Sequence, residues 1–114
     1  MHIEDLKKVG IDGPTEGILI IDIYTTWCGP CKVIAPILHK LRDEGLIKLI
    51  QVDLDQNRPL GEIFGITAIP TLLFFKEGQL LEKLIEVDGQ VLVKRGIMIG
   101  AAGERTLRAI IQQI

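Results

Sequence analysis

An apolar run, Ile18–Tyr24, leads into a pair of cysteines, and this junction constrains the fold more than any other feature. Both alternating faces of the run are apolar apart from Asp22, a pattern typical of a central strand that is covered on both sides. After the loop residues 25–30, apolar residues recur at helical spacing, at Val33, Ile34, Ile37, Leu38 and Leu41. A buried strand followed at once by a helix is typical of an α/β fold.

The rest of the chain continues this alternation of strands and helices. Residues 47–54 predict a second buried strand, 59–64 a short helix and 71–75 a third strand. The closing residues carry the apolar stripe of a last helix, at Leu107, Ile110, Ile111 and Ile114. We therefore expect one α/β domain over residues 1–114, with a mixed central β-sheet flanked by helices.

The segment near residues 80–99 predicts an extra β-hairpin. It is rich in strand formers and is interrupted by Asp88-Gly89, a strong signal for a two-residue turn. With that turn, Val87 would face Gln90, Ile85 would face Leu92 and Glu82 would face Arg95. We expect the hairpin to leave the sheet at the end opposite the cysteines, where it would cover the sheet edge or form a dimer contact, the edge cover being favoured.

Charge and hydropathy exclude several classes of function. The formal net charge is −2, so the chain lacks the basic character of proteins that bind nucleic acid or anionic membranes. Its purely apolar runs are too short to span a bilayer. Acidic residues near the start, Glu4 and Asp5, do not fit a secretory signal peptide, so we expect a cytoplasmic protein.

Cys28 and Cys31 are the only cysteines, and their spacing indicates chemistry rather than structural support. A disulfide between them closes a very small loop, and stabilisation by a disulfide grows with loop length. A tetrahedral zinc site needs two more ligands, and neither His2 nor His39 has the spacing to supply them. We therefore expect no metal.

The position of the pair favours dithiol–disulfide exchange. Cys28 falls where a strand passes into a helix, and a helix N-terminus stabilises an anion such as a thiolate. Cys28 is therefore predicted to be the attacking thiol, and the more exposed one, while Cys31 resolves the mixed disulfide. Asp22, a lone carboxylate in an apolar strand, should be desolvated, which raises its pKa.

The string Trp27-Cys28-Gly29-Pro30-Cys31-Lys32 resembles the active site of thioredoxins. The likeness continues in residues 52–57, in 65–71, at Gly78 and from the Gly100-Ala101 pair into the last helix. This resemblance implies the thioredoxin fold and a protein-disulfide reductase. It also implies no cofactor beyond a redox-active Cys28–Cys31 disulfide, and disulfide-containing client proteins and a thioredoxin reductase as partners of a monomer or weak dimer.

The resemblance also assigns roles to individual residues. Asp22 matches a buried proton-transfer partner of the resolving cysteine, although it could instead be a purely structural residue. Pro70 matches a cis proline, and Ile69 before it would pair its backbone with a substrate segment, unless it is simply part of the core. A flat docking surface around the thiols is implied for Trp27, Gly29, Pro30, Ile69 and Gly100.

The chain departs from the family pattern in three places. Gln51 stands where the family often has a lysine near the buried aspartate, and this should leave the Asp22 pKa higher. The N-terminal part is short, so the first edge strand would be reduced or absent. Extra residues lie between Gly78 and Gly100.

Two other functions remain open at this point. One is a binding subunit that uses the same apolar surface without redox turnover. The other is an oxidant or disulfide isomerase, against which the Gly29-Pro30 pair argues because the residues between the cysteines tune the redox potential.

Overall fold

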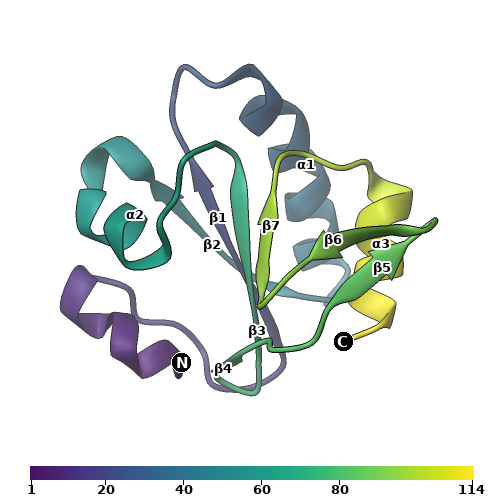
Figure 1. Ribbon diagram of the computed structural model, residues 1–114, viewed down its shortest axis with the longest axis horizontal. Coiled ribbons are helices and arrows are strands. Elements are labelled where there is room, and N and C mark those ends of the chain that lie inside the picture. Colours follow the sequence, from purple (N-terminus) through teal and green to yellow (C-terminus); the bar gives the residue numbers. More distant parts are fainter.

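A computed structural model describes all 114 residues and shows a mixed β-sheet between two layers of helices (Figure 1). The sheet strands are β1 (Ile18–Tyr24), β2 (Lys48–Asp53), β3 (Thr71–Lys76), β4 (Gln79–Leu80) and β7 (Ile97–Ile99). Their order is β2-β1-β3-β4, and β7 also pairs with β3. Strand β1 is parallel to β2 and antiparallel to β3, so it is the buried inner strand that the sequence predicts.

The helices divide between the two faces of the sheet. They are α1 (Gly29–Asp43), α2 (Arg58–Phe64) and α3 (Glu104–Gln112), with 3₁₀ helices η1 (Ile3–Val9) and η2 (Leu54–Gln56). Helix α2 is short because both ends are capped. The Asn57 side chain accepts a hydrogen bond from Leu60 N–H, and Gly65 adopts the left-handed conformation, with φ 61°.

Each face of the sheet has its own hydrophobic core. The face formed by Ile20, Leu72, Phe74 and Met98 packs against α1 and α3. The opposite face, with Leu19, Ile21, Ile23, Leu73 and Phe75, packs against η1 and α2. Alternate residues of β1 and β3 therefore point into different cores, and both strands are held from two sides.

Strand β2 differs from the prediction of a second buried strand. It lies at the edge of the sheet, and its residues are exposed or only partly buried. The reason is that no strand precedes β1: the N-terminal residues form η1 and a loop instead. The expectation of a reduced or absent first strand is thus confirmed. Its consequence, that β2 becomes an edge strand, could not be read from the apolar composition of residues 47–54.

The predicted hairpin is present as β5 (Ile85–Val87) and β6 (Gln90–Val93). It turns at Asp88-Gly89, both in the left-handed region, and Val87 faces Gln90 as expected. A bulge between Ile85 and Glu86 shifts the register further on, so Ile85 faces Val93 rather than Leu92. Glu82 and Arg95 lie outside the ladder, and the expected pairing between them is wrong.

The hairpin is part of the core rather than an appendage. It leaves after β4, at the end of the sheet opposite the cysteines, and extends beyond β7 alongside α3 (Figure 1). It forms its own two-stranded sheet and contacts α3, where Gln113 Nε2 donates to the Glu86 carbonyl. Its inward residues, Ile85 and Val93, are fully buried in the core that α1 and α3 cover.

This packing predicts that Ile85→Ala lowers stability sharply. Emptying a buried isoleucine site removes apolar contact and leaves a cavity, at a cost of about 2–5 kcal/mol in the free energy of unfolding. Leu84→Ala is the matched control, because Leu84 is adjacent in the chain but 57% exposed, and surface changes usually stay within about 0.5 kcal/mol. Urea unfolding of both variants makes the comparison, and equal losses would contradict the packing described here.

Candidate functional site

Three loops meet at one end of the sheet. Strand β1 ends at Tyr24, where it runs into the cysteine loop. Because β3 is antiparallel to β1, with Ile23 opposite Thr71, the segment before Thr71 lies at the same end. Thr71 also pairs with Ile99, the last residue of β7. The topology therefore brings the cysteine loop, the Ile69-Pro70 loop and Gly100 to one end of the molecule, at the top of Figure 1.

Cys28 and Cys31 form a disulfide at the N-terminus of α1. Cys28 is the N-cap residue, and its Sγ accepts a hydrogen bond from Cys31 N–H at 3.2 Å. Only 5% of Cys28 and 3% of Cys31 is exposed. Cys28 is thus only slightly the more exposed cysteine in this oxidised form, and its position at the helix end is what distinguishes it.

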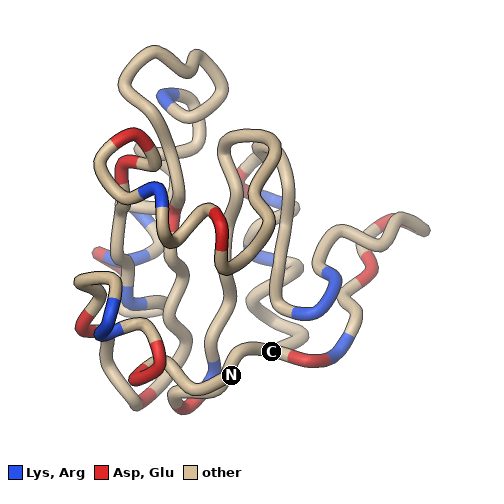
Figure 2. The backbone as a smooth tube through the Cα atoms, turned by 60° about the vertical axis from the view of Figure 1, so that its left-hand side comes forward, with Lys and Arg blue, Asp and Glu red and all other residues tan.

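The electrostatics at this helix end favour a thiolate. The helix dipole places a partial positive charge at the N-terminus of the 15-residue α1, next to the Cys28 Sγ. The first turn of α1 contains no acidic residue, and Lys32 follows Cys31 directly. Figure 2 shows the cysteine loop free of acidic residues, while acidic and basic residues are scattered over the rest of the chain. A thiolate at Cys28 would therefore be attracted by the helix end, with no acidic residue in the cysteine loop itself.

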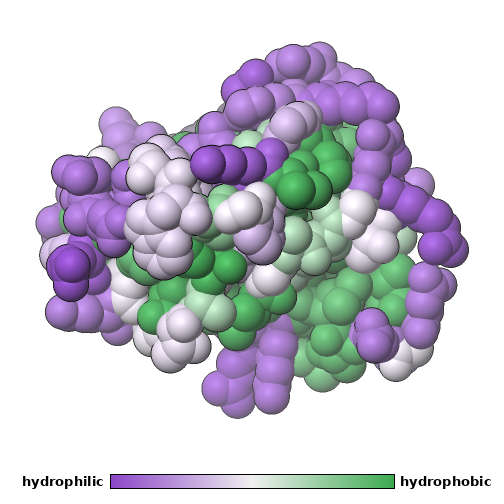
Figure 3. Space-filling view, turned by 90° about the horizontal axis from the view of Figure 1, so that it is seen from above, coloured by the Kyte–Doolittle hydropathy of each residue, from purple (hydrophilic) through white to green (hydrophobic).

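An apolar surface surrounds the disulfide. Trp27 is 70% exposed and Ile99 is 65% exposed, while Gly29 and Pro30 are exposed beside them. Figure 3 looks onto this end of the molecule and shows hydrophobic residues across the middle and lower part of the view, with hydrophilic residues along its left, upper and right sides. Exposed apolar groups of this kind mark protein-binding surfaces. Sequence reasoning included Trp27 but missed Ile99, whose exposure depends on its place at the end of β7.

The Ile69-Pro70 loop and Gly100 are held together by a backbone hydrogen bond. The peptide bond between Ile69 and Pro70 is cis, as the family resemblance implies. Gly100 N–H donates to the Pro70 carbonyl at 2.8 Å, while Pro70 is buried and Ile69 is partly exposed. Gly100 has φ 93°, a conformation that suits glycine. The partial exposure of Ile69 distinguishes it from a purely core residue.

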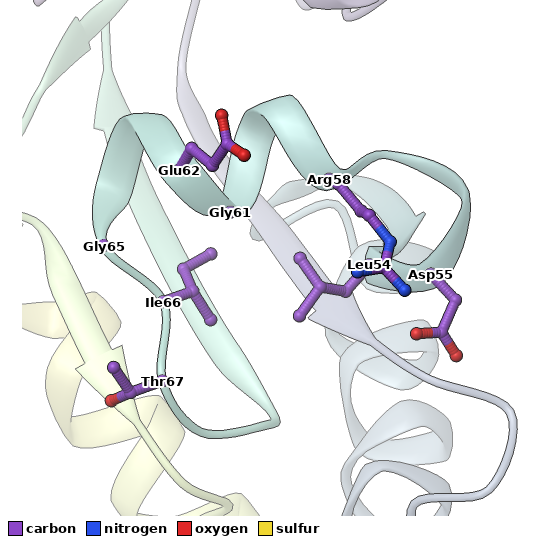
Figure 4. A pocket seen from close by; sticks show the side chains of 8 residues that line it. All are labelled: Leu54, Asp55, Arg58, Gly61, Glu62, Gly65, Ile66 and Thr67. Carbon is purple, nitrogen blue, oxygen red and sulfur yellow. The ribbon is translucent and has the colours of Figure 1, made fainter.

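The exposed Trp27 ring is anchored from below by Asp55. Trp27 Nε1 donates to Asp55 Oδ2 at 3.0 Å, and Asp55 lies in η2, directly after the end of β2. Asp55 also lines a shallow hollow of about 440 Å³ beside α2, shown in Figure 4 together with Arg58, Glu62 and Ile66. The sequence offered one signal for Asp55, which is that it follows a strand parallel to the one before the cysteines, so both strands end on the same side.

A cavity of about 310 Å³ connects Asp22 with Cys31. It is lined by Asp22, Tyr24, Thr25, Thr26, Cys31, Lys32, Ala35 and Gln51. Asp22 is fully buried; its Oδ2 accepts from Gln51 Nε2 at 3.1 Å, while its Oδ1 has no hydrogen-bond partner in the protein. One carboxylate oxygen is therefore free to bind a proton, in a cavity that Cys31 shares and that is large enough for water.

Burial is the main influence on Asp22. It raises the pKa of the Asp22 carboxyl above its ordinary value, because a charged group loses hydration inside the protein. The hydrogen bond from Gln51 and the charge of His39 oppose this effect and lower the same pKa. The direction agrees with the prediction from the apolar strand, and a carboxyl with a raised pKa is suited to accept and return protons near neutral pH.

Comparison with known proteins decides the family. The sequence model of the Thioredoxin family matches residues 8–97. This chain belongs to the thioredoxin family. Thioredoxin from Staphylococcus aureus is 39% identical over 88 residues, covering 75% of this chain and 85% of the relative. Thioredoxin from Bacillus subtilis is 40% identical over 70 residues, covering 60% of this chain and 67% of the relative.

Solved thioredoxin structures share the fold. Oxidised mitochondrial thioredoxin 3 from Saccharomyces cerevisiae is 30% identical, with a TM-score of 0.65 over 87% of this chain and 80% of that one. A mutant thioredoxin from Halobacterium salinarum, 24% identical, has the same fold, with a TM-score of 0.70 over 96% and 82% of the two chains. The thioredoxin fold expected from the sequence is thus confirmed, and the extra hairpin is built onto it.

Family membership explains what the cysteine pair does. Thioredoxins are disulfide oxidoreductases that work through a redox-active disulfide, and this chain has a disulfide between two closely spaced cysteines within the matched region. No group of three or more His, Cys, Asp or Glu side chains is arranged to hold a metal ion. No helix combines the length and apolar character needed to cross a membrane.

Proposed function

We propose that this thioredoxin reduces disulfide bonds in client proteins, with Cys28 as the attacking thiol and Cys31 as the resolving thiol. The observation that carries the assignment is the place of Cys28 as N-cap of α1, where its sulfur accepts the Cys31 N–H. A thiolate at this position accepts a hydrogen bond from a backbone N–H that has no partner within the helix. This interaction lowers the free-energy cost of ionising the Cys28 thiol.

The exchange takes place in two steps that balance. The Cys28 thiolate attacks one sulfur of the client disulfide, forms a mixed disulfide and releases the other client sulfur as a thiolate. Cys31 then loses its proton and attacks Cys28, forming the Cys28–Cys31 disulfide and releasing the second client thiolate. The client gains two electrons and this protein loses two. A thioredoxin reductase would return the disulfide to the dithiol.

The remaining residues of the site have supporting roles in this proposal. The client-docking surface would be formed by Trp27, Gly29, Pro30, Ile69, Pro70 and Gly100. We add Ile99 to it, because Ile99 is exposed at the same end. Asp22 would take the proton of Cys31 through the shared cavity and release it later. A client segment would pair with the backbone at Ile69.

The proposed setting is the cytosol, where thiols are kept reduced and a dithiol can act as a reductant. An oxidant or isomerase role is not better supported, and the Gly29-Pro30 pair argues against it, because the residues between the cysteines tune the redox potential. A binding role without redox turnover would use the same docking surface. Replacing the cysteines distinguishes this role from a reductase, since binding alone would persist without them.

Limited alkylation tests the assignment of the two thiols. The reduced protein is treated with a small amount of iodoacetamide near neutral pH, and the labelled peptides are identified by mass spectrometry. We expect the label mainly on Cys28, because its thiolate is the one stabilised by the helix end. The unfolded protein is the control and should label both cysteines alike. A label mainly on Cys31 would reverse the roles proposed here.

A further inference from the structure

Three polar side chains from three elements form a connected line that starts at Asp22. Asp22 on β1 and Gln51 on β2 are register partners in the parallel pair, and the Gln51 Nε2 donates to Asp22 Oδ2 at 3.1 Å. His39 on α1 completes the line, with its Nε2 2.9 Å from Gln51 Oε1. His39 has no part in the exchange chemistry described above.

We propose that His39 is a positioning residue that sets the orientation of the Gln51 amide and thereby the protonation of Asp22 during the resolving step. This inference rests on the proposed role of Asp22 as the proton acceptor for Cys31. Asp22 is buried, Gln51 is exposed and His39 is half-buried. The line therefore links a group inside the protein to one that exchanges protons with solvent.

The protonation states follow from the hydrogen-bonding capacity of each group. An ionised carboxylate only accepts hydrogen bonds, so the amide nitrogen of Gln51 must face Asp22. The amide oxygen then faces His39, which must donate from Nε2. A protonated imidazole always carries that N–H, whereas a neutral imidazole carries it in only one of two tautomers. A protonated His39 therefore favours an ionised Asp22.

The reverse orientation suits the opposite pair of states. When Asp22 holds the proton taken from Cys31, it can donate to the Gln51 oxygen if the amide turns over. The amide nitrogen then donates to a neutral His39. Each orientation matches one state of the exchange, and histidine is the side chain that changes charge between about pH 5 and pH 8. Acidification thus stabilises the carboxylate just where bulk pH would protonate it.

The other titratable groups around this line have partners of their own or form no hydrogen bond with it. On α1, Asp43 lies one turn beyond His39 and is ion-paired with Arg42 at 3.1 Å, and Lys40 is ion-paired with Glu104 of α3. On the same face of β2, Asp53 accepts from Asp55 N–H. Lys32 and Tyr24 line the same cavity as Asp22 and Gln51, but neither forms a hydrogen bond with the three side chains of the line. The side chains of His39 and Gln51 hydrogen-bond within the line alone.

The resolving step can be observed directly with an aromatic disulfide such as Ellman's reagent. Cys28 of the reduced protein displaces one coloured thiolate, and Cys31 then displaces the second, so the second release reports the step that needs Asp22. Its rate is measured by stopped flow from about pH 5 to pH 9, a range that spans histidine titration. The variants are Gln51→Leu and His39→Leu.

We expect Gln51→Leu to slow the second release about tenfold near pH 6 and to move the acid limb of the profile to higher pH, because the carboxylate loses its donor. His39→Leu should act in the same direction by about threefold. Both variants should match the wild type at the alkaline end. His2→Asn is the matched control, since it removes the other histidine while asparagine still caps η1, and its profile should be unchanged.

A role in stability alone would lower the unfolding midpoint and leave the pH profile in place, and that result would overturn the inference. Asp22→Asn distinguishes the proposed role of Asp22 as proton acceptor from the proposed role of His39 as a positioning residue. If it leaves the second release unchanged at every pH, the proposed role of Asp22 fails. If it slows the release while Gln51→Leu and His39→Leu keep the wild-type profile, only the inference about His39 fails.

Discussion

A Cys31→Ser variant is expected to remain covalently bound to its client through Cys28. The first exchange step needs only the Cys28 thiolate, and it proceeds as in the wild type. The second step needs a sulfur next to Cys28, and Cys31 is the residue whose sulfur bonds to Cys28 in the oxidised protein. A serine hydroxyl does not ionise at neutral pH and cannot displace a thiolate, so the mixed disulfide persists.

Insulin with intact disulfides is a suitable client for this experiment. The reduced Cys31→Ser variant is mixed with insulin, and acid then stops the exchange by protonating the thiolates. The products are separated without reductant and analysed by mass spectrometry. We expect an adduct that joins Cys28 to an insulin cysteine and that dithiothreitol releases. Cys28→Ser is the control and should form no such adduct. An adduct that forms equally well through Cys31 of the Cys28→Ser variant would contradict the order of the two steps.

Asp22→Asn is expected to slow turnover by about 10²-fold near neutral pH, the lower end of what general acid–base catalysis contributes. The amide cannot take the Cys31 proton, although it keeps the shape of the side chain and can still accept from Gln51. The slowing should be confined to the second release of the aromatic thiolate, because Cys28 ionises at the helix end without Asp22. Slowing of the first release to the same extent would contradict this assignment.

The same variant should be more stable than the wild type, and the difference should depend on pH. Burial raises the folded-state pKa of Asp22 above its ordinary value of 3.8, so the folded protein holds a proton that the unfolded chain has lost. The stability due to that proton is fully present below the ordinary value and is lost as pH rises through the raised pKa. The advantage of Asp22→Asn therefore grows by about 1.4 kcal/mol per pH unit across that window and then levels off.

Urea unfolding of the reduced wild type and of the reduced Asp22→Asn variant, at several pH values, measures this difference. Taking the difference between the two proteins removes the shared contribution of the exposed carboxyls. Among these, the Arg108 hydrogen bond lowers the pKa of Glu44, and the Lys40 hydrogen bond lowers that of Glu104. A constant difference at all pH values would show that Asp22 keeps its ordinary pKa in the folded protein.

Much of the site could be predicted from the sequence because it depends on local pattern. The apolar run over 18–24 fixes β1, and the helical spacing after it fixes α1, so the cysteines had to lie at the junction. The isolation of Asp22 in that run also indicated its burial and the direction of its pKa. The cis bond before Pro70 was implied only by the family resemblance.

The parts that the sequence did not predict depend on neighbours far away in the chain. Whether β2 is buried is decided by the presence of another strand beside it, and the composition of β2 carries no information on that. The bulge between Ile85 and Glu86 lies in β5, the hairpin strand that contacts α3 from a distant part of the chain. The contact between His39 and Gln51 requires the register of β2 and the rotation of α1, neither of which a spacing rule supplies.

If the Cys28–Cys31 pair catalyses reduction of protein disulfides, the protein should accelerate the reduction of insulin by dithiothreitol. Precipitation of the freed insulin chains is followed by turbidity with catalytic amounts of wild type, Cys28→Ser and Cys31→Ser. We predict that the wild type accelerates precipitation, that Cys28→Ser leaves it at the rate of dithiothreitol alone, and that Cys31→Ser accelerates it far less than the wild type, because its mixed disulfide has to be resolved by dithiothreitol. Acceleration by Cys28→Ser equal to that of the wild type, or none by the wild type, would contradict the account.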